Sequence, residues 1–211
     1  MTAPSKGHQE LVSYLTLRRV IGALGVLLPV LLVAWVYLTG RTTLEPSISE
    51  YYGTEARDLL VGSLFAIGLF LFSYRGHDRR DDRAGDWACV FALGVALFPT
   101  TSDVGLVRVL HLVFATALFL VLAYFSLALF TKTDPTMPPT KEKLLRNRLY
   151  VTCGVVMLAC IAAIVLFYVV LRDSPVAGVK PVFWLESIAL WAFGWSWFVK
   201  GETLLKDRGT T

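Results

Sequence analysis

The sequence predicts an all-α membrane protein, a bundle of six transmembrane helices with both termini in the cytoplasm. The first observation behind this prediction is six long apolar stretches in a chain of 211 residues that is 55% hydrophobic and only 17% charged. A soluble domain of this length carries more charge and shorter apolar runs. The second observation is that lysine and arginine are concentrated in every second gap between the stretches.

The apolar stretches define the expected spans. A helix needs about 20 apolar residues to cross a hydrocarbon core of roughly 30 Å. The third stretch reaches this length only if residues 84–86 and 99–101 lie at the membrane interfaces. In chain order, the expected spans are residues 20–38, 59–74, 87–98, 106–130, 150–171 and 182–199.

Residues at the ends of these stretches support the assignment. The first stretch follows Arg18 and Arg19 but ends without a small-x-small cleavage site, so it is expected to be a retained helix rather than a secretory signal. The second and fourth helices are expected to be capped by Thr54 and Asp103. Pro181 suits the first turn of the sixth helix. Glycines are expected just after the second and sixth helices, at Gly76 and Gly201.

Small residues within the stretches are expected to serve packing. Close helix approach is predicted at Gly62, Ala66, Ala88, Ala92 and Ala96. The three cysteines, Cys89, Cys153 and Cys160, fall inside spans and have neither disulfide nor zinc spacing, so they too are expected to pack as small apolar residues. No cofactor and no metal is predicted.

The distribution of positive charge predicts the orientation. Fifteen of the 20 lysine and arginine residues lie in the N-terminal segment, the second and fourth gaps and the C-terminal tail. Because positive charge is retained on the cytoplasmic side, the predicted topology is N-in and C-in, in a bacterial plasma membrane. The organisation expected is one transmembrane domain at residues 19–200, between cytoplasmic segments 1–18 and 201–211. The expected partners are membrane lipids and other copies of the chain, and not nucleic acid.

Ionisable and polar residues gather toward the outer ends of the second, fourth and sixth spans. At a rise of 1.5 Å per residue they lie at similar depths, and such groups usually face the bundle interior. We therefore predict one outward-facing pocket among the following residues: Glu50, Tyr51, Tyr52, Asp58, Ser63, Asp103, Arg108, His111 and Glu186.

Simpler roles remain open for these residues. Asp58 and Asp103 fit as helix-start carboxylates, and Arg108 fits as a side chain that reaches the outer headgroups. His111 fits as a buried imidazole bonded to a neighbouring helix. Glu186 either pairs with Arg108 or His111, or lines an outward-opening cavity.

Tryptophan is concentrated in the last span. Trp184 and the pair Trp195 and Trp197 are expected near opposite interfaces, where amphipathic rings are favoured. Trp191 is at mid-span and is expected to pack against another helix.

The outer loop after the first span contains Pro46 and the run Ile48-Ser49-Glu50, and Ser47 with Glu50 forms a possible capping box. A Pro-x-x-Ile-Ser-Asp/Glu stretch directly after the first of six spans resembles the DRAM-type family of six-helix membrane proteins and their bacterial relatives, with Glu50 where that family usually has Asp. The resemblance implies a role in membrane lipid handling or signalling, without a defined enzyme activity.

Three functions fit these features. The first is binding of a lipid or other amphiphile in the outward-facing pocket. The second is transport of a small solute or protons, with His111 and Glu186 as relay groups. The third is hydrolysis of a membrane lipid. The last span has no histidine, in contrast to the paired H-x-x-x-H near the end of membrane hydrolases of the ceramidase/progestin-receptor superfamily. No catalytic residue is assigned from the sequence.

Overall fold

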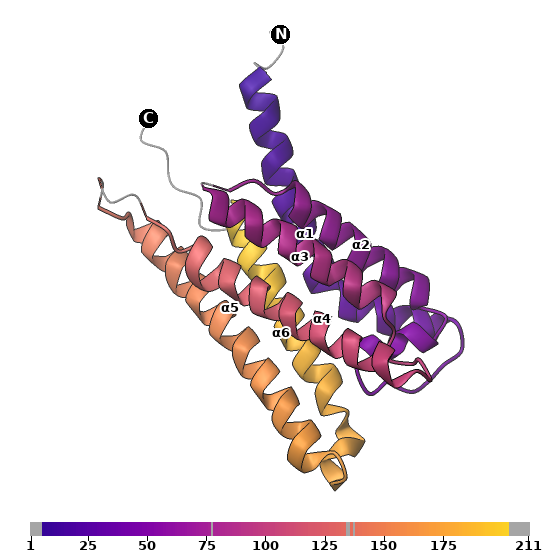
Figure 1. Cartoon of the computed structure of the whole chain (residues 1–211). Coiled ribbons are helices and arrows are strands. Elements are labelled where there is room, and N and C mark those ends of the chain that lie inside the picture. Colours follow the sequence, from indigo (N-terminus) through magenta and orange to yellow (C-terminus); the bar gives the residue numbers. More distant parts are fainter. Residues whose placement is uncertain (1–5, 77, 134–135, 137, 203–211) are drawn as a thin grey trace.

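The computed structural model describes residues 6–76, 78–133, 136 and 138–202, with only the backbone described for residues 6–13. Every regular element in this part of the chain is helical (Figure 1). The long helices are α1 (Lys6–Leu38), α2 (Arg57–Ser73), α3 (Arg79–Leu97), α4 (Gly105–Tyr124), α5 (Lys141–Leu166) and α6 (Pro181–Lys200). Shorter elements are the 3₁₀ turns η1 (Ser49–Gly53) and η4 (Pro175–Val179) and the π-helical turns η2 (Phe125–Leu129) and η3 (Phe167–Leu171).

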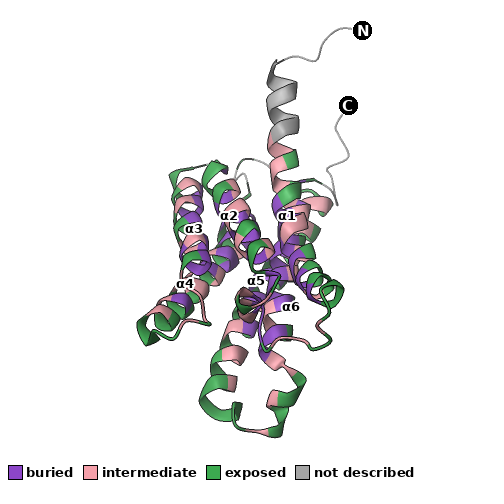
Figure 2. Cartoon of the chain, turned by 90° about the vertical axis from the view of Figure 1, so that its right-hand side faces the viewer, coloured by how far each residue is buried: buried purple, intermediate pink, exposed green. Residues whose placement is uncertain are grey.

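The six helices form a ring in chain order. Each helix packs on the next one along the chain, and α6 returns to pack on α1 (Figure 1). Buried residues lie mainly where the helices face one another (Figure 2). The short connections place η1 at one end of the ring and the α2–α3 and α4–α5 connections at the other. We call these the η1 end and the basic end, the latter because it carries Arg18, Lys132 and Lys143.

The outer surface of the ring is strongly apolar. Leu38, Leu106 and Val169 are 84%, 66% and 77% exposed. Four stretches are long and apolar enough to cross a membrane: Tyr14–Leu38, Gly105–Leu129, Lys141–Leu171 and Pro181–Lys200. The other two helices do not reach this length and hydropathy, because α2 has only 17 residues and α3 begins with a charged run. The structure thus confirms an all-helical fold with six long helices among the described residues.

Several helices extend beyond the apolar stretches. The first begins at Lys6, so no break separates a segment 1–18 from the helix, and residues 1–5 lie outside the described part of the chain. The fifth begins at Lys141, where the Thr140 hydroxyl accepts the N–H of Lys143 at 3.1 Å and caps the helix. Of the expected tail, residues 203–211 lie outside the described residues.

The charged residues expected in the second gap form the first turn of α3. Asp78 caps this helix by accepting the N–H groups of Arg80 and Asp81, and the Asp81 carboxylate accepts the N–H of Asp78 in return. Lys132 donates to Asp78 and Asp81 at 3.1 and 3.0 Å. The hydrogen bond from Lys132 lowers the pKa of Asp78. Partial burial acts to lower the pKa of Lys132, but its hydrogen bonds to the two carboxylates outweigh this and raise it.

The expected helix ends are correct for α6 and wrong for α2 and α4. Pro181 is in the first turn of α6 and Gly201 follows its last residue. The position before α2 is Ala56, whose N–H bonds to the Thr54 hydroxyl at 3.1 Å, so Thr54 orders the preceding turn instead. The corresponding position of α4 is Val104.

The expected cap of α4 and the glycine expected directly after α2 are both corrected by the structure. The N–H of Val104 bonds to the Ser102 hydroxyl at 3.2 Å, so Asp103 does not cap α4. At the C-terminal end of α2, the residue that directly follows the helix is Tyr74. Gly76, which was expected in this place, lies two positions later.

The backbones of α1 and α6 approach each other closely. A Cβ atom on Gly194 would lie 2.6 Å from the Gly22 carbonyl oxygen, and one on Gly22 would lie 2.9 Å from that of Gly194. These two glycines therefore let the backbones touch. Gly62 has open space at its Cβ position, so its expected packing role is wrong, whereas the alanines expected on α3 and all three cysteines are buried.

An aromatic cluster fills the core toward the basic end. Trp197 is fully buried, with ring centroids 5.1 to 5.6 Å from those of Tyr74, Phe125 and Phe130. Its ring therefore lies inside the bundle and not on the outer surface, which the sequence did not indicate. Trp191 packs against another helix as predicted, since its indole N–H donates to the Val26 carbonyl of α1 at 3.1 Å.

Candidate functional site: a cavity beneath the η1 turn

The loop between α1 and α2 folds over the end of the ring. Within it, the Ser47 hydroxyl accepts the N–H of Glu50 at 3.2 Å, which is one of the two bonds of the predicted capping box, although the residue that precedes η1 is Ile48. The Pro46 carbonyl accepts the N–H of Phe183, the third residue of α6, at 3.0 Å. These bonds fix residues 46–50 against α6.

Glu186 holds the centre of this loop. Its Oε2 atom accepts the N–H of Ile48 at 2.6 Å across 138 positions of the chain. Ile48 is buried, and an unpaired buried N–H is costly, so the carboxylate supplies an acceptor that the loop itself lacks.

His111 binds the next residue of the same loop. This side chain is only 3% exposed, and its Nε2 atom lies 2.9 Å from the Ser49 hydroxyl. Its Nδ1 atom lies 2.6 Å from the Phe98 carbonyl oxygen. Because a carbonyl oxygen can only accept, Nδ1 carries the proton, and Nε2 of a neutral ring then accepts from the hydroxyl. The geometry thus assigns Ser49 as donor and His111 as acceptor.

A cavity of about 60 Å³ lies directly beneath these contacts. Its polar lining is confined to Ser49, Tyr52, His111 and Glu186. The rest is apolar and comes from α1, α2, α3, α4 and α6, with residues such as Leu28, Leu64, Val95, Leu118 and Leu190. His111 of α4 and Glu186 of α6 therefore line the same hollow. They are joined through Ile48 and Ser49, with no direct bond between the two side chains among the described residues.

Other predicted pocket residues lie around the loop. Tyr51 is fully buried, with its ring centroid 6.2 Å from that of Phe183. Tyr52 accepts from Arg57 through its hydroxyl at 3.2 Å, and that guanidinium lies over the Tyr52 ring. Glu50 is half-buried, and burial together with the nearby charge of Glu45 raises its pKa.

The remaining candidates are placed differently. Ser63 is buried on α2, outside the cavity lining. Asp58, Asp103 and Arg108 are exposed. Arg108 donates to the Ser102 carbonyl at 2.8 Å, so of the alternatives for Glu186 the structure does not show pairing with Arg108, and Glu186 lines the cavity instead.

Sequence reasoning missed two members of the site. Ser49 was placed only in a loop motif, although it is the hydroxyl that His111 binds. Thr100 donates to the Ser49 carbonyl at 3.3 Å. Both contacts connect segments that are distant in the sequence, and no local pattern signals them.

Among the residues that the structure describes, no group of three histidine, cysteine, aspartate or glutamate side chains comes together as a candidate metal site. The chain matches no protein-family model, no curated protein and no solved structure.

Proposed function

We propose that this chain is an integral protein of a bacterial plasma membrane whose six helices all cross the bilayer, with both termini in the cytoplasm. The apolar outer surface and the four long apolar helices support a membrane location. Fifteen of 20 basic residues fall in the segments that this topology places inside. Since α2 and α3 are flanked by helices in the ring, they are proposed to span alongside them.

Labelling of single cysteines tests this topology. In a background with Cys89, Cys153 and Cys160 replaced by serine, Thr42→Cys should react with an impermeant maleimide added outside intact cells. Thr133→Cys should react only after the cells are opened. Equal labelling of both positions from outside would rule out the proposed topology.

For its activity, we propose binding of a lipid or other amphiphile at the cavity beneath η1. One observation carries this proposal: the polar groups Ser49, His111 and Glu186 lie at one end of a cavity that is otherwise apolar. An amphiphile has the same division, with a head that hydrogen-bonds and a chain that does not. At about 60 Å³ the cavity is smaller than one of about 150 Å³ that holds benzene. It therefore fits the first part of one hydrocarbon chain rather than a whole lipid.

Filling the cavity tests this function. Ala115 lines it from α4, whereas Val113 on the same helix is exposed. Native mass spectrometry of the purified protein should find a retained lipid or amphiphile in the wild type and in Val113→Phe, and less of it in Ala115→Phe. Equal retention by the two phenylalanine variants would contradict binding in this cavity.

A second candidate function, hydrolysis of a lipid ester, is favoured by the Ser49–His111 contact. A serine hydroxyl that donates to a histidine whose other nitrogen is held by a carbonyl has the arrangement of a nucleophile and its base. This candidate ranks second because the adjacent N–H of Ile48 is bonded to Glu186 and is not free to stabilise an oxyanion. Labelling by a fluorophosphonate, abolished in Ser49→Ala, would support it, and absence of labelling in the wild type would contradict it.

A further inference from the structure

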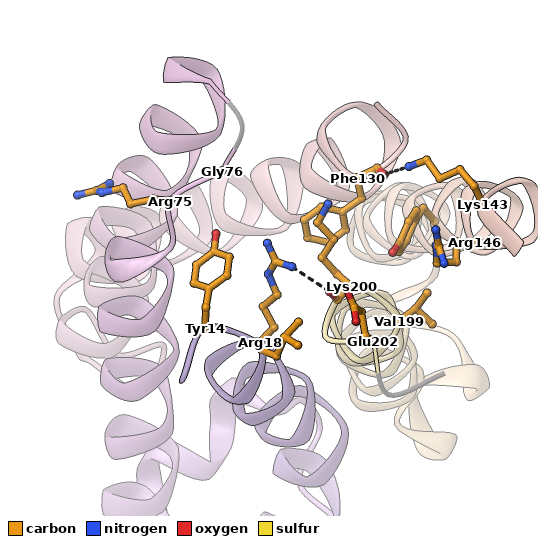
Figure 3. A pocket seen from close by; sticks show the side chains of 12 residues that line it. Tyr14, Arg18, Arg75, Gly76, Phe130, Lys143, Arg146, Val199, Lys200 and Glu202 are labelled. Carbon is orange, nitrogen blue, oxygen red and sulfur yellow. Dashed lines mark hydrogen bonds between the residues drawn. The ribbon is translucent and has the colours of Figure 1, made fainter. Parts of the chain in front are cut away.

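A second hollow, of about 440 Å³, lies at the basic end of the ring (Figure 3). It is bounded by the beginning of α1, the residues after α2, the beginning of α5 and the end of α6. The η1 cavity shares no lining residue with it. Along α6, Phe193 lines the cavity, Lys200 lines the basic pocket, and the buried Trp197 lies between them.

Positive charge from three helices converges on this basic pocket. Arg18 comes from α1, Lys143 and Arg146 from α5, and Lys200 from α6. Arg75 also lines the pocket but pairs with Asp86 at 3.3 Å and points away from the other cations in Figure 3. Glu202 is the one carboxylate in the described lining. Cations held this close repel one another, and a bound anion offsets that repulsion.

Arg18 is held in place with hydrogen-bonding capacity to spare. One terminal nitrogen donates to the Lys200 carbonyl at 3.1 Å, and the guanidinium carbon lies 4.2 Å from the centre of the Tyr14 ring. Its Nε atom and the Tyr14 hydroxyl are both buried and have no hydrogen-bond partner among the described residues. Buried donors are nearly always paired, so their lack of a partner points to a missing acceptor.

Aromatic rings form part of the wall of the pocket. Phe130 and Tyr150 line it together with Tyr14, and the Lys200 ammonium lies 5.2 Å from the centre of the Phe130 ring. The rings hold the cationic side chains in place and limit their contact with water. A hydrogen-bond acceptor bound here would therefore contact basic side chains that are already held in position.

We propose that the basic pocket binds a phosphoryl group, as the head of an anionic lipid or as a free phosphate. Four basic side chains against one carboxylate suit a group that carries more than one negative charge and several acceptor oxygens. A guanidinium binds such oxygens in pairs, and lysine adds a point charge. In the orientation proposed above, the pocket opens at the cytoplasmic leaflet, where anionic lipids are concentrated.

The test uses the whole protein in nanodiscs. In the first arm, pyrophosphate is titrated into protein in phosphatidylcholine nanodiscs, and the rise in the temperature of unfolding gives the affinity. In the second arm, the nanodiscs contain phosphatidic acid, and native mass spectrometry counts the lipids that the protein retains. Saturable binding in the first arm identifies a free phosphate, and selective retention in the second identifies a lipid head.

Charge variants then locate the binding. Arg18→Gln and Arg146→Gln should each weaken binding by about tenfold or more, since a hydrogen bond to a charged group is lost. Arg79→Gln removes the same charge from an exposed position at the same end, outside the pocket, and should bind as the wild type does. If Arg18→Gln does not fold, Lys143→Gln takes its place. The absence of binding in both arms, or an equal loss in Arg79→Gln, would overturn the proposal.

Discussion

The Nε2 atom of His111 lies 2.9 Å from the Ser49 hydroxyl oxygen, although 62 positions separate the two residues in the chain. The Ile48 N–H, one residue earlier, bonds to Glu186 of α6. Two adjacent residues of one loop are thus held by side chains from two different helices, and the loop closes the cavity below it.

Replacing Glu186 should destabilise the loop to a degree that depends on the new side chain. In Glu186→Ala the buried Ile48 N–H loses its acceptor, so we expect the free energy of unfolding to fall by about 1–3 kcal/mol. Glu186→Gln keeps an oxygen at this position and should cost less. Denaturant unfolding in detergent measures both variants, and an alanine variant as stable as the wild type would contradict the assigned role of the carboxylate.

The contact between Ser49 and His111 should appear as an energetic coupling. In a double-mutant cycle of Ser49→Ala and His111→Leu, the effects on unfolding free energy should depart from additivity by about 0.5–3 kcal/mol. Ser126 bonds to Ser196 elsewhere in the bundle, so Ser49→Ala and Ser126→Ala should be additive. Additive effects in the first cycle would mean that the hydrogen bond contributes no stability.

Gly194 should not tolerate a methyl group. Its Cβ would lie 2.6 Å from the backbone oxygen of Gly22, so Gly194→Ala must push α1 and α6 apart, at a cost of about 1–3 kcal/mol. Gly62→Ala is the matched control, because its Cβ meets open space and alanine favours the helix. Thermal unfolding should separate the two variants, and similar unfolding temperatures would show that the α1–α6 contact is looser than described.

The Lys132 bridge at the start of α3 should make stability depend on pH. The pKa of Asp78 is lowered in the folded state, so its contribution is present above its unfolded pKa of about 4 and is lost as the pH falls through the folded value. The pKa of Lys132 is raised, so its contribution is present below its unfolded pKa of about 10.5 and is lost as the pH rises through the folded value.

Unfolding measured between neutral and acidic pH tests this bridge. Stability should fall less steeply in Lys132→Met than in the wild type, because methionine gives the Asp78 carboxylate no hydrogen bond. Arg79→Met, which changes an exposed charge nearby, should follow the wild type. Identical acid sensitivity in Lys132→Met and the wild type would contradict the bridge.

The general fold follows from the sequence because apolar length and periodicity are local properties. Six helices were expected and six long helices are present in the described chain. The expected helix ends were wrong where a residue other than the expected cap accepts the backbone N–H, as the Ser102 hydroxyl does before α4. The burial of Trp197 could not be predicted, because tryptophan suits an interface and a core equally well. Only the packing of its ring against Tyr74, Phe125 and Phe130 shows that it is buried.

The candidate site could be predicted only in part. Matched depth along the helices correctly indicated that His111 and Glu186 lie close to one cavity. Depth does not give the direction in which a side chain points, and for that reason Arg108 and Asp58 were included although both are exposed. The role of Ser49 depends on how the loop folds back, which is a tertiary property.

The buried Trp197 ring has a consequence for the idea of transport. The ring lies between the two hollows along α6 and contacts Tyr74, Phe125 and Phe130, so a solute that moved from one hollow to the other along α6 would have to displace one of the largest buried side chains of the core. Among the described residues, the cavity beneath η1 and the basic pocket are therefore two separate recesses with no lining residue in common.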